Sequence, residues 1–511
     1  MPTTNFVANT TAIAATWLNE IDEHAFEKKH GIYIADTAAV GDGTTDDYAI
    51  IRAAHTAAVL AGVPLVFEAN TTYAMDTAQW AIDTYSVIQT NGCVFKSLTT
   101  STGNSAWIDV GANVTIDWLN VLIPTGIRRD RAIRAWNDNT RINRITLNST
   151  DVQLTSETDD GGVLITAGSD SWFGLIEVTN YDKACTIANT SRCFIGKINI
   201  TGYVRGVYAY DNTDFLWAGG LFKTRSTNAS NAAGHNGLLM QSNTANAQKN
   251  VTISDLIVED AGEHAIRIGG AEQHLNIRLI RPTCYNAGNC GIKVLGTDTS
   301  APTSRNQNII IDDPIIEDCG TSGSTATNRA GILLQFADFV VVNNPIVKTR
   351  ALSVSAAYGI LIDACKEVII NSPICYNATF DGIFVYAWNG DNERVQIRGG
   401  ISKDNGRHGL NVQADATRTL RRVDVDGLLC ETNLDLGARI LVSGTAVDCR
   451  VRVKAYSNTN GIGSCNSSAF TLHLDGVPGT TVLSGITANN GSTASDGTSF
   501  NYRKAGAWVA L

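Results

Sequence analysis

Charge and proline are scarce in this 511-residue chain, in which charged residues make up 17% and proline occurs 9 times. An ordinary soluble domain carries about 25% charged residues, so the shortage argues against long charged surface helices and against a helical bundle or coiled coil. The formal net charge of −10 argues against nucleic acid as a partner. No apolar run approaches the roughly 18 residues of a membrane-spanning helix, so membrane insertion is not expected.

Signals for export and for metal binding are also missing. Residues 1–10 are polar and lack the apolar stretch of a signal peptide, so secretion by that route is not expected. The 11 cysteines include no Cys-x-x-Cys pair, and no acidic cluster has the spacing of a calcium loop. We therefore predict no metal and no cofactor, and reduced, buried thiols in a protein assembled in a cytosol.

What the sequence does contain is a repeat. Hydrophobic residues make up 44% of the chain and glycine occurs 46 times, so a large core can be buried. A small residue followed by a short apolar strand recurs at intervals of 23 to 40 residues. The clearest copies begin at Gly237, Ala265, Gly291, Gly331, Gly359, Gly382, Gly409 and, more weakly, Gly437, and fainter copies begin at Ala132, Gly162, Ala184 and Gly206.

Each repeat holds two further strand phrases. The second is typified by Val340-Val-Val, and the third often starts with proline, as in Pro314-Ile-Ile and Pro345-Ile-Val. Proline lacks an N–H group, so its recurrence in one register marks a repeated corner. Three short strands per repeat, with no helical period between them, predict an all-β fold. We expect a parallel β-helix of about twelve coils over residues 81–445, with coils about 4.8 Å apart.

The alternation within each strand separates core from surface. In the phrase that follows Gly331, the first and third residues are predicted to face inward and the second outward. Cys284 and Cys375 each fall two residues after a corner proline, in the register of apolar residues. They are therefore predicted to be inert thiols of the core.

A different segment precedes the β-helix. Residues 41–47, Gly-Asp-Gly-Thr-Thr-Asp-Asp, lead into a predicted amphipathic helix over residues 48–61, which Asp46 is placed to cap. Residues 62–68 then predict a turn and a strand. Because a helix here would cover the open end of a solenoid, residues 31–80 are predicted to form an N-terminal cap.

These first segments resemble a known group. Residues 41–47, the helix, Val63-Pro-Leu-Val-Phe and Thr71-Thr-Tyr73 resemble the start of the pectate-lyase-like right-handed β-helix of bacteriophage tailspike depolymerases. Residues 1–30, which include Trp17, resemble the short adaptor of some podovirus-type tail spikes. The resemblance implies a homotrimeric receptor-binding spike of the virion tail, assembled in the bacterial host cytoplasm. It also implies cleavage of capsular polysaccharide or lipopolysaccharide, and attachment through the adaptor to a phage tail or another tailspike.

The repeat fades after about Gly444. Residues 446–511 contain short apolar phrases, among them 472–476, 481–485 and 508–511, and are predicted to form a small antiparallel β module. In the proteins that this chain resembles, such a module often holds the trimer together, so trimerisation is the role expected for it here.

Glycoside hydrolysis needs two carboxyl groups, about 5–5.5 Å apart for retention of configuration and about 6.5–9.5 Å apart for inversion. Neighbouring coils supply such spacings easily.

Acids in turns are too frequent to be informative on their own. Asp260, Asn286, Asn377 and Asp404 each lie five residues before a strand phrase and are interpreted as a repeated Asx turn.

A more informative set lies four residues after the start of each repeat. Sugar rings pack their apolar faces on aromatic rings, and their hydroxyl groups need polar partners. A saccharide groove is therefore predicted where this set is polar or aromatic and has outward aromatic neighbours. Its predicted members are Gln335, Asp363, Phe384, Tyr386, Trp388 and Gln413.

The preferred catalytic pair is Asp363 with Glu393, because both lie beside this groove. Asp391, in the same loop as Glu393, is the next choice. Glu317 with Asp318, beside the long loop 319–330, is another. The sequence leaves retention and inversion of configuration equally open.

A second aromatic patch is predicted from Tyr203, Tyr208, Tyr210 and Trp217, with Asp211 and Asp214 beside it. It is either a further sugar subsite or a trimer contact.

The preferred function is endo-acting glycoside hydrolysis of a bacterial surface polysaccharide by two carboxyl groups. One alternative is a polysaccharide lyase, for which His235, His264 or His408 would be the base, although each of these histidines is also placed as a turn residue. The other alternative is an adhesin that binds glycan without cleaving it.

Overall fold

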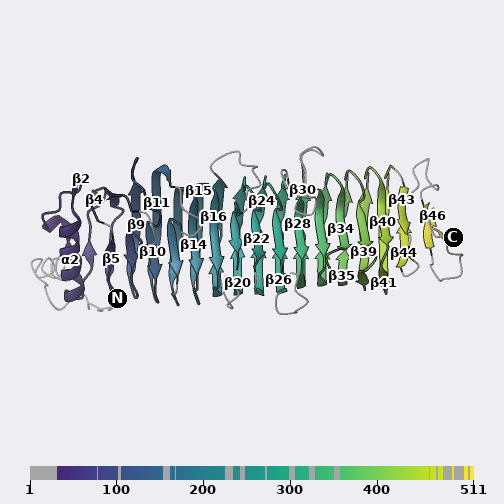
Figure 1. Ribbon diagram of the computed structural model, residues 1–511, viewed down its shortest axis with the longest axis horizontal. Coiled ribbons are helices and arrows are strands. Elements are labelled where there is room, and N and C mark those ends of the chain that lie inside the picture. The colour runs from purple at the N-terminus through teal and green to yellow at the C-terminus, as the bar shows by residue number, and fades with distance from the viewer. Residues whose placement is uncertain are drawn as a thin grey trace, which may run out of the picture.

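The chain forms a straight rod of stacked strands with a helix at its N-terminal end (Figure 1). This computed structural model describes residues 31–465 except 78, 102–104, 154–160, 167, 225–233, 242–247, 271–272, 298–304, 321–328, 350–356 and 460, together with residues 467, 470–475, 486–487, 500–504 and 507–510. The adaptor predicted for residues 1–30 lies outside the described residues.

The predicted N-terminal cap contains the single α-helix of the described residues. Its elements are β1 (Ile32–Tyr33), a 3-10 helix η2 (Ile34–Asp36), β2 (Asp42–Asp46), α2 (Tyr48–Ala61), β3 (Leu65–Val66) and β4 (Thr72–Met75). Helix α2 has the predicted bounds, and its apolar side, with Ile51 and Ala58, is buried. In the described part of the chain, no helix is long and apolar enough to cross a membrane.

Two aspartates fix the start of α2. Asp46 Oδ1 accepts the N–H of Tyr48, the first helical residue, at 3.0 Å, which satisfies one of the free donors at the helix start. Asp47 is fully buried, and its carboxylate accepts the N–H groups of Val40 at 2.7 Å and Gly41 at 3.0 Å. The acids of the 41–47 motif therefore hold the cap together.

Each coil contributes one strand to a sixteen-stranded parallel sheet. These strands are β5 (Trp80–Ile82), β8 (Ile108–Val110), β10 (Ile133–Trp136), β12 (Val163–Thr166), β14 (Lys183–Ala188), β16 (Arg205–Tyr210), β19 (Leu238–Met240), β22 (Ile266–Gly269), β25 (Ile292–Leu295), β28 (Ala330–Gln335), β31 (Tyr358–Asp363), β34 (Asp381–Ala387), β37 (Leu410–Ala414), β40 (Leu436–Val442), β43 (Gly461–Cys465) and β45 (Ile486–Thr487).

The second and third strands of the coils belong to a 31-stranded sheet. The second strands, some of which continue into the third, are β6 (Val87–Gln89), β9 (Thr115–Ile123), β11 (Arg141–Gln153), β13 (Trp172–Tyr181), β15 (Phe194–Tyr203), β17 (Thr213–Trp217), β20 (Lys249–Ser254), β23 (Leu275–Ile280), β26 (Asn306–Asp312), β29 (Ala337–Asn343), β32 (Lys366–Asn371), β35 (Asn392–Arg398), β38 (Thr419–Arg421), β39 (Asp424–Glu431), β41 (Thr445–Val447), β42 (Cys449–Tyr456) and β44 (Phe470–Asp475). The separate third strands are β7 (Val94–Ser97), β18 (Gly220–Thr224), β21 (Leu256–Glu259), β24 (Thr283–Tyr285), β27 (Ile315–Glu317), β30 (Ile346–Lys348), β33 (Ile374–Tyr376) and β36 (Ile401–Lys403).

This arrangement confirms the predicted right-handed parallel β-helix with three strands per coil. It has about fourteen turns, close to the twelve or so predicted. Ile332 and Leu334 lie in the long apolar core, as the alternation predicts, together with Cys284 and Cys375. All 11 cysteines are free and buried, so the prediction of core thiols is confirmed.

The parallel ladder continues beyond residue 445. Strand β42 pairs in parallel with β44, and β44 in turn with β46 (Phe500–Lys504). Antiparallel pairing in this region joins β46 to β47 (Ala507–Ala510). Among the described residues of this region, the expected antiparallel pairing is found between β46 and β47, whereas β42 continues the outward-inward alternation and parallel register of the coil before it. Residues 481–485 lie outside the described residues.

Candidate functional site

The predicted outward set forms one column on the sixteen-stranded sheet. Parallel pairing places Gln335 beside Asp363, Asp363 beside Tyr386, and Tyr386 beside Gln413. These residues are far apart in sequence, but each lies at the same position in its coil. The prediction that they lie side by side is confirmed.

Asp363, the preferred catalytic acid, is only 1% exposed. Its Oδ1 accepts the backbone N–H groups of Trp388 at 3.2 Å and Asn389 at 3.1 Å. Its Oδ2 accepts the side-chain amides of Gln335, at 2.8 Å, and of Asn389. Burial raises the pKa of this carboxyl, while the four donors act in the opposite direction. Asp363 therefore fixes the corner that follows β34 and has little surface to offer a sugar.

Three aromatic side chains continue along the next coil. The ring centroids of Phe384 and Tyr386 are 4.7 Å apart, and those of Tyr386 and Trp388 are 5.6 Å apart. Trp388 is 45% exposed, whereas Phe384 is 4% exposed and packs in an outer apolar cluster with Leu333 and Leu361. The prediction that Phe384 is an open platform for sugar is wrong, because outward side chains in register cover one another. Tyr386 and Trp388 keep exposed surface.

The other acids near this patch have partners of their own. Glu393 Oε1 lies 2.7 Å from Nη1 of Arg394, and Arg394 also pairs with Glu367. Asp391 is exposed, and its Oδ1 accepts the backbone N–H of Thr419 at 2.8 Å. Asp363 therefore contacts the corner at residues 388–389, while Glu393 contacts Arg394, so the two acids of the preferred catalytic pair have different partners.

The remaining predicted acids, Glu317 and Asp318, line an open groove of about 630 Å³ on the third strands. We call this groove, lined by Glu259, Asp260, Tyr285, Asn286, Glu317 and Asp318, the acidic groove. Parallel pairing places Glu259 beside Tyr285 and Tyr285 beside Glu317, so one tyrosine separates two glutamates.

The aspartates and the asparagine of the groove form its turn. Asp260, Asn286 and Asp318 all adopt the left-handed conformation, with φ between 51° and 58°. Asn286 Nδ2 donates to Asp260 Oδ1 at 2.7 Å, which ties one coil to the next. Asp and Asn tolerate this conformation better than other residues with a side chain. The prediction of a repeated turn is confirmed, and it leaves Glu259 and Glu317 for chemistry.

The two glutamates occupy the same outward position two coils apart. Their Cα atoms are therefore about 9.6 Å apart at the usual strand spacing. Lys223 Nζ lies 3.8 Å from Glu259 Oε2, and Lys348 Nζ lies 3.1 Å from Glu317 Oε2. Sequence reasoning missed Glu259, although aligning the third strand phrases, which end at Glu259, Tyr285 and Glu317, would have found it.

The second predicted aromatic patch is divided between core and surface. Trp217 is fully buried, stacks on Phe222 and donates its Nε1–H to the carbonyl of Gly219 at 2.7 Å. The prediction that Trp217 contacts sugar is wrong, because it occupies an inward position on β17. Tyr208 and Tyr210 are partly exposed, with ring centroids 5.1 Å apart.

Tyr208 lines a pocket of about 240 Å³ on the outer face of the sixteen-stranded sheet. Two of its lining residues are cationic and none is acidic, so we call it the basic pocket. Its lining residues are Lys183, Arg205, Val207, Tyr208, Gly234, Asn236, Leu239 and Gln241.

Two of the three candidate bases are buried. His264 is inaccessible and His408 is 2% exposed. Burial lowers the pKa of His264 well below its usual value and that of His408 to about 4, so both are neutral near pH 7. Each accepts a backbone N–H through Nδ1, as expected of turn residues. In the described part of the chain, no three His, Cys, Asp or Glu side chains are placed to hold a metal ion.

The fold resembles that of a solved phage protein. The N-terminal fragment of the bacteriophage Phi29 gene product 12 aligns with a TM-score of 0.52 at 12% identity, covering 90% of this chain and 88% of that one. The tailspike protein of E. coli bacteriophage HK620, in complex with a pentasaccharide, aligns at 11% identity with a TM-score of 0.46, covering 92% and 80%. The periplasmic alginate epimerase AlgG aligns at 13% identity with a TM-score of 0.36, covering 81% and 76%. No protein-family model and no curated protein sequence matches the chain. At the level of fold, the predicted resemblance to phage β-helix proteins is confirmed.

Proposed function

We propose that this chain is the receptor-binding spike of a phage tail, and that it cleaves a bacterial surface polysaccharide as an endo-acting glycoside hydrolase. The observation that carries the proposal is the acidic groove, where Glu259 and Glu317 stand two coils apart with Tyr285 between them. An open groove suits an endo-acting enzyme, because a long polymer can lie across it without threading its end.

The separation of the glutamates favours inversion of configuration. In an inverting hydrolase the two carboxyl groups are about 6.5–9.5 Å apart, which leaves room for the attacking water. We propose that one of the two glutamates activates the attacking water while the other protonates the leaving oxygen.

The outer face of the sixteen-stranded sheet is proposed to bind further sugar units of the same chain. Tyr386 and Trp388 offer partly exposed rings, and Gln413 continues their column. Asp391 and Glu393 beside Trp388 form the alternative catalytic pair, since Asp363 is occupied by its four donors.

The acidic groove is tested by incubating the purified protein with a panel of bacterial capsular and O-antigen polysaccharides. The protein should release new reducing ends from one of them, and Glu259→Gln and Glu317→Gln should each lower the rate at least about a hundredfold. Glu431→Gln is the matched control, because Glu431 occupies the same position of a later coil and pairs with Lys403 at 3.6 Å. Full activity in both groove variants, with loss in Asp391→Asn or Glu393→Gln, would move the catalytic site to the alternative pair.

The same products separate the other candidate functions. The cations of the basic pocket favour a polysaccharide lyase as the second candidate, since β-elimination needs a cation to neutralise the uronate. A lyase also creates a new reducing end, but it leaves an unsaturated sugar at the non-reducing end of the other product, which a hydrolase does not. An adhesin binds the polysaccharide and leaves its length unchanged.

An outward apolar stripe supports assembly into a homotrimer. Seven partly exposed aliphatic residues occupy one outward position of successive third strands, interrupted once by Thr283. They are Leu221, Ile257, Ile315, Ile346, Ile374, Ile401 and Leu429. Such an exposed apolar stripe is typical of an interaction surface. Copies of the same rod have the same coil spacing, so the stripe of one copy matches that of another in register. Ile315 and Glu317 both point outward from β27, with the inward Ile316 between them. A second chain on this stripe would therefore border the acidic groove. Residues 1–30 are proposed to join the spike to the phage tail or another tailspike.

A further inference from the structure

The basic pocket is separate from the acidic groove, since it lies on the sixteen-stranded sheet over β14, β16 and β19. Parallel pairing places Lys183 directly beside Arg205, so the two cations occupy neighbouring coils. The Lys183 ammonium lies 5.0 Å from the centroid of the Tyr208 ring, and Lys183 is only 6% exposed. The cations and the aromatic ring therefore form one continuous wall.

Two further lining residues, Gly234 and Asn236, are held in place by the buried acid Glu263. Glu263 Oε2 accepts the backbone N–H of Gly234 at 2.8 Å and the side-chain amide of Asn236 at 3.0 Å. Glu263 Oε1 lies 3.8 Å from the Arg267 guanidinium, so its charge has a cationic neighbour. A wall that is fixed before binding lowers the entropy lost when a ligand is bound.

The surrounding strands strengthen the positive field. In β14, β16, β19, β22 and β25 the charged residues are Lys183, Arg205, Arg267 and Lys293, and these five strands contain no acid. Lys293 lies beside Arg267 and is 7% exposed. The chain as a whole has a net charge of −10. Because Glu263 pairs with Arg267, the preference for an anionic ligand rests on the pocket's own cations, Lys183 and Arg205.

We propose that the basic pocket binds a sugar residue that carries a carboxylate. Lys183 and Arg205 would neutralise the carboxylate, and Tyr208 and Leu239 would contact the C–H face of the ring. The amide of Gln241 supplies a donor and an acceptor for a hydroxyl group. The inference deepens the proposed function, because it makes the polysaccharide an acidic one.

The test is a binding measurement with monosaccharides, observed by ligand NMR. The probes are glucuronate, galacturonate, mannuronate and N-acetylneuraminate, each with its uncharged counterpart, which is glucose, galactose, mannose or N-acetylmannosamine. At least one acid should bind about tenfold more tightly than its counterpart, and this preference should weaken as salt is added. Lys183→Gln and Arg205→Gln should each lower the affinity for that acid by about tenfold or more.

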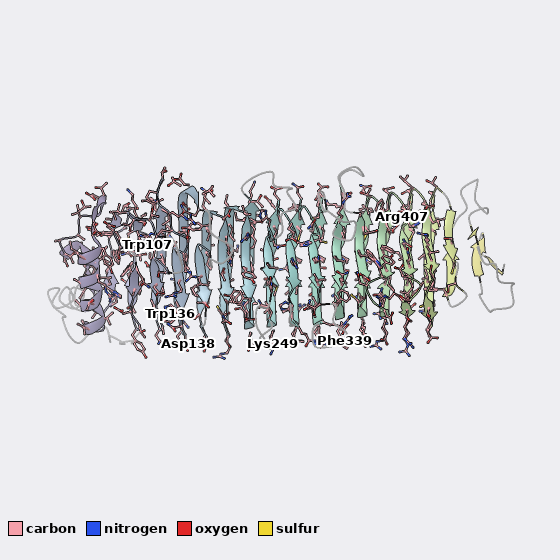
Figure 2. All side chains as sticks on the ribbon, in the orientation of Figure 1. Trp107, Trp136, Asp138, Lys249, Phe339 and Arg407 are labelled. Atoms are coloured by element: carbon pink, nitrogen blue, oxygen red, sulfur yellow. The ribbon has the colours of Figure 1, made fainter. Side chains whose placement is uncertain are left out.

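Lys249→Gln is the matched control, because Lys249 is an exposed cation that does not line the basic pocket. It lies on the edge of the rod opposite Arg407 (Figure 2), and its substitution should leave binding unchanged. Equal unfolding temperatures of all variants would show that the pocket variants fold. The proposal would be overturned if no acidic sugar bound, or if acidic and uncharged sugars bound with equal affinity. It would also be overturned if sulfated or phosphorylated monosaccharides bound as tightly as the carboxylate sugars. Monosaccharide binding is measured without cleavage, so absence of hydrolysis at the acidic groove would leave this test unaffected, which keeps failure of this inference distinct from failure of the hydrolase.

Discussion

Glu317 and Asp318 are adjacent in sequence, yet the fold gives them different roles. Glu317 ends a strand, points outward and pairs with Lys348. Asp318 has a φ of 54° and belongs to the turn that every coil repeats. Sequence alone could predict the turn, since Asp and Asn recur at that position. It could not rank the outward acids, because their partners come from neighbouring coils.

Asp363 should be important for stability and dispensable for cleavage. Asp363→Ala removes the acceptor for four donors inside the protein, and each buried donor left without a partner costs about 1–3 kcal/mol. We expect a loss of about 3 kcal/mol or more in the free energy of unfolding, measured by denaturant titration.

Asp391→Ala serves as the comparison for that variant, since Asp391 is exposed and accepts the backbone N–H of Thr419. It should lose less than about 1 kcal/mol. An Asp363→Asn variant that is as stable as the natural protein but cannot cleave polysaccharide would make Asp363 catalytic after all.

Buried histidines should make the protein sensitive to acid. Burial lowers the pKa of His55 and of His274 to about 4, against 6.5 in an unfolded chain. Between these values the unfolded state binds more protons, so stability is complete above pH 6.5 and falls as the pH drops toward 4, by up to about 3 kcal/mol for each histidine. Thermal unfolding at one scan rate between pH 7.5 and 4.5 measures this loss. His274→Gln should reduce the pH dependence, and an unchanged dependence would mean that His274 does not contribute to it.

At the scale of elements, the sequence predicts most of what the structure shows. Helix α2 has the predicted bounds, and the column from Gln335 to Gln413 is one register column. Trp217 was misplaced because its coil lacks a clear repeat phrase from which inward and outward positions could be counted. Phe384 was placed on the correct face, but a single sequence does not show that Leu333 and Leu361 stack beside it.

Corner glycines differ in how strictly they are required. Gly400 has a φ of 90°, and a Cβ atom there would lie 2.3 Å from the carbonyl oxygen of Pro373. Gly399 has a φ of 61° and open space around it. Gly400→Asn should destabilise the protein by about 2 kcal/mol or more, whereas Gly399→Asn should change stability by less than about 1 kcal/mol. Equal unfolding temperatures for the two variants would contradict this account of the corner.

At the scale of the whole molecule, low charge follows from the architecture. The coils bury apolar strands along the full length of the rod, while ion pairs between outward residues join neighbouring coils. The outward aliphatic stripe is the exception to a polar surface, and it follows the rod axis across eight third-strand positions, one of which is Thr283. The adaptor and the intersubunit contacts could not be derived from one chain.

The apolar stripe should control the oligomeric state. Ile346→Lys combined with Ile374→Lys places two charges where a second chain would pack, so light scattering after size-exclusion chromatography should change from the mass of a trimer to that of a monomer. Val341→Lys combined with Ile369→Lys, outward on the neighbouring second strands, is the control and should remain trimeric. A natural protein that is monomeric would refute the proposed assembly.

The most direct test of the central claim is the anomeric configuration of the first product. The proposed inverting mechanism is a single displacement by water, so proton NMR during cleavage should show a new reducing end of inverted configuration before mutarotation begins. Both Glu259→Gln and Glu317→Gln should abolish this signal, and Glu431→Gln should preserve it. A product that first forms with retained configuration, or one with an unsaturated end, would contradict the assignment of these two glutamates.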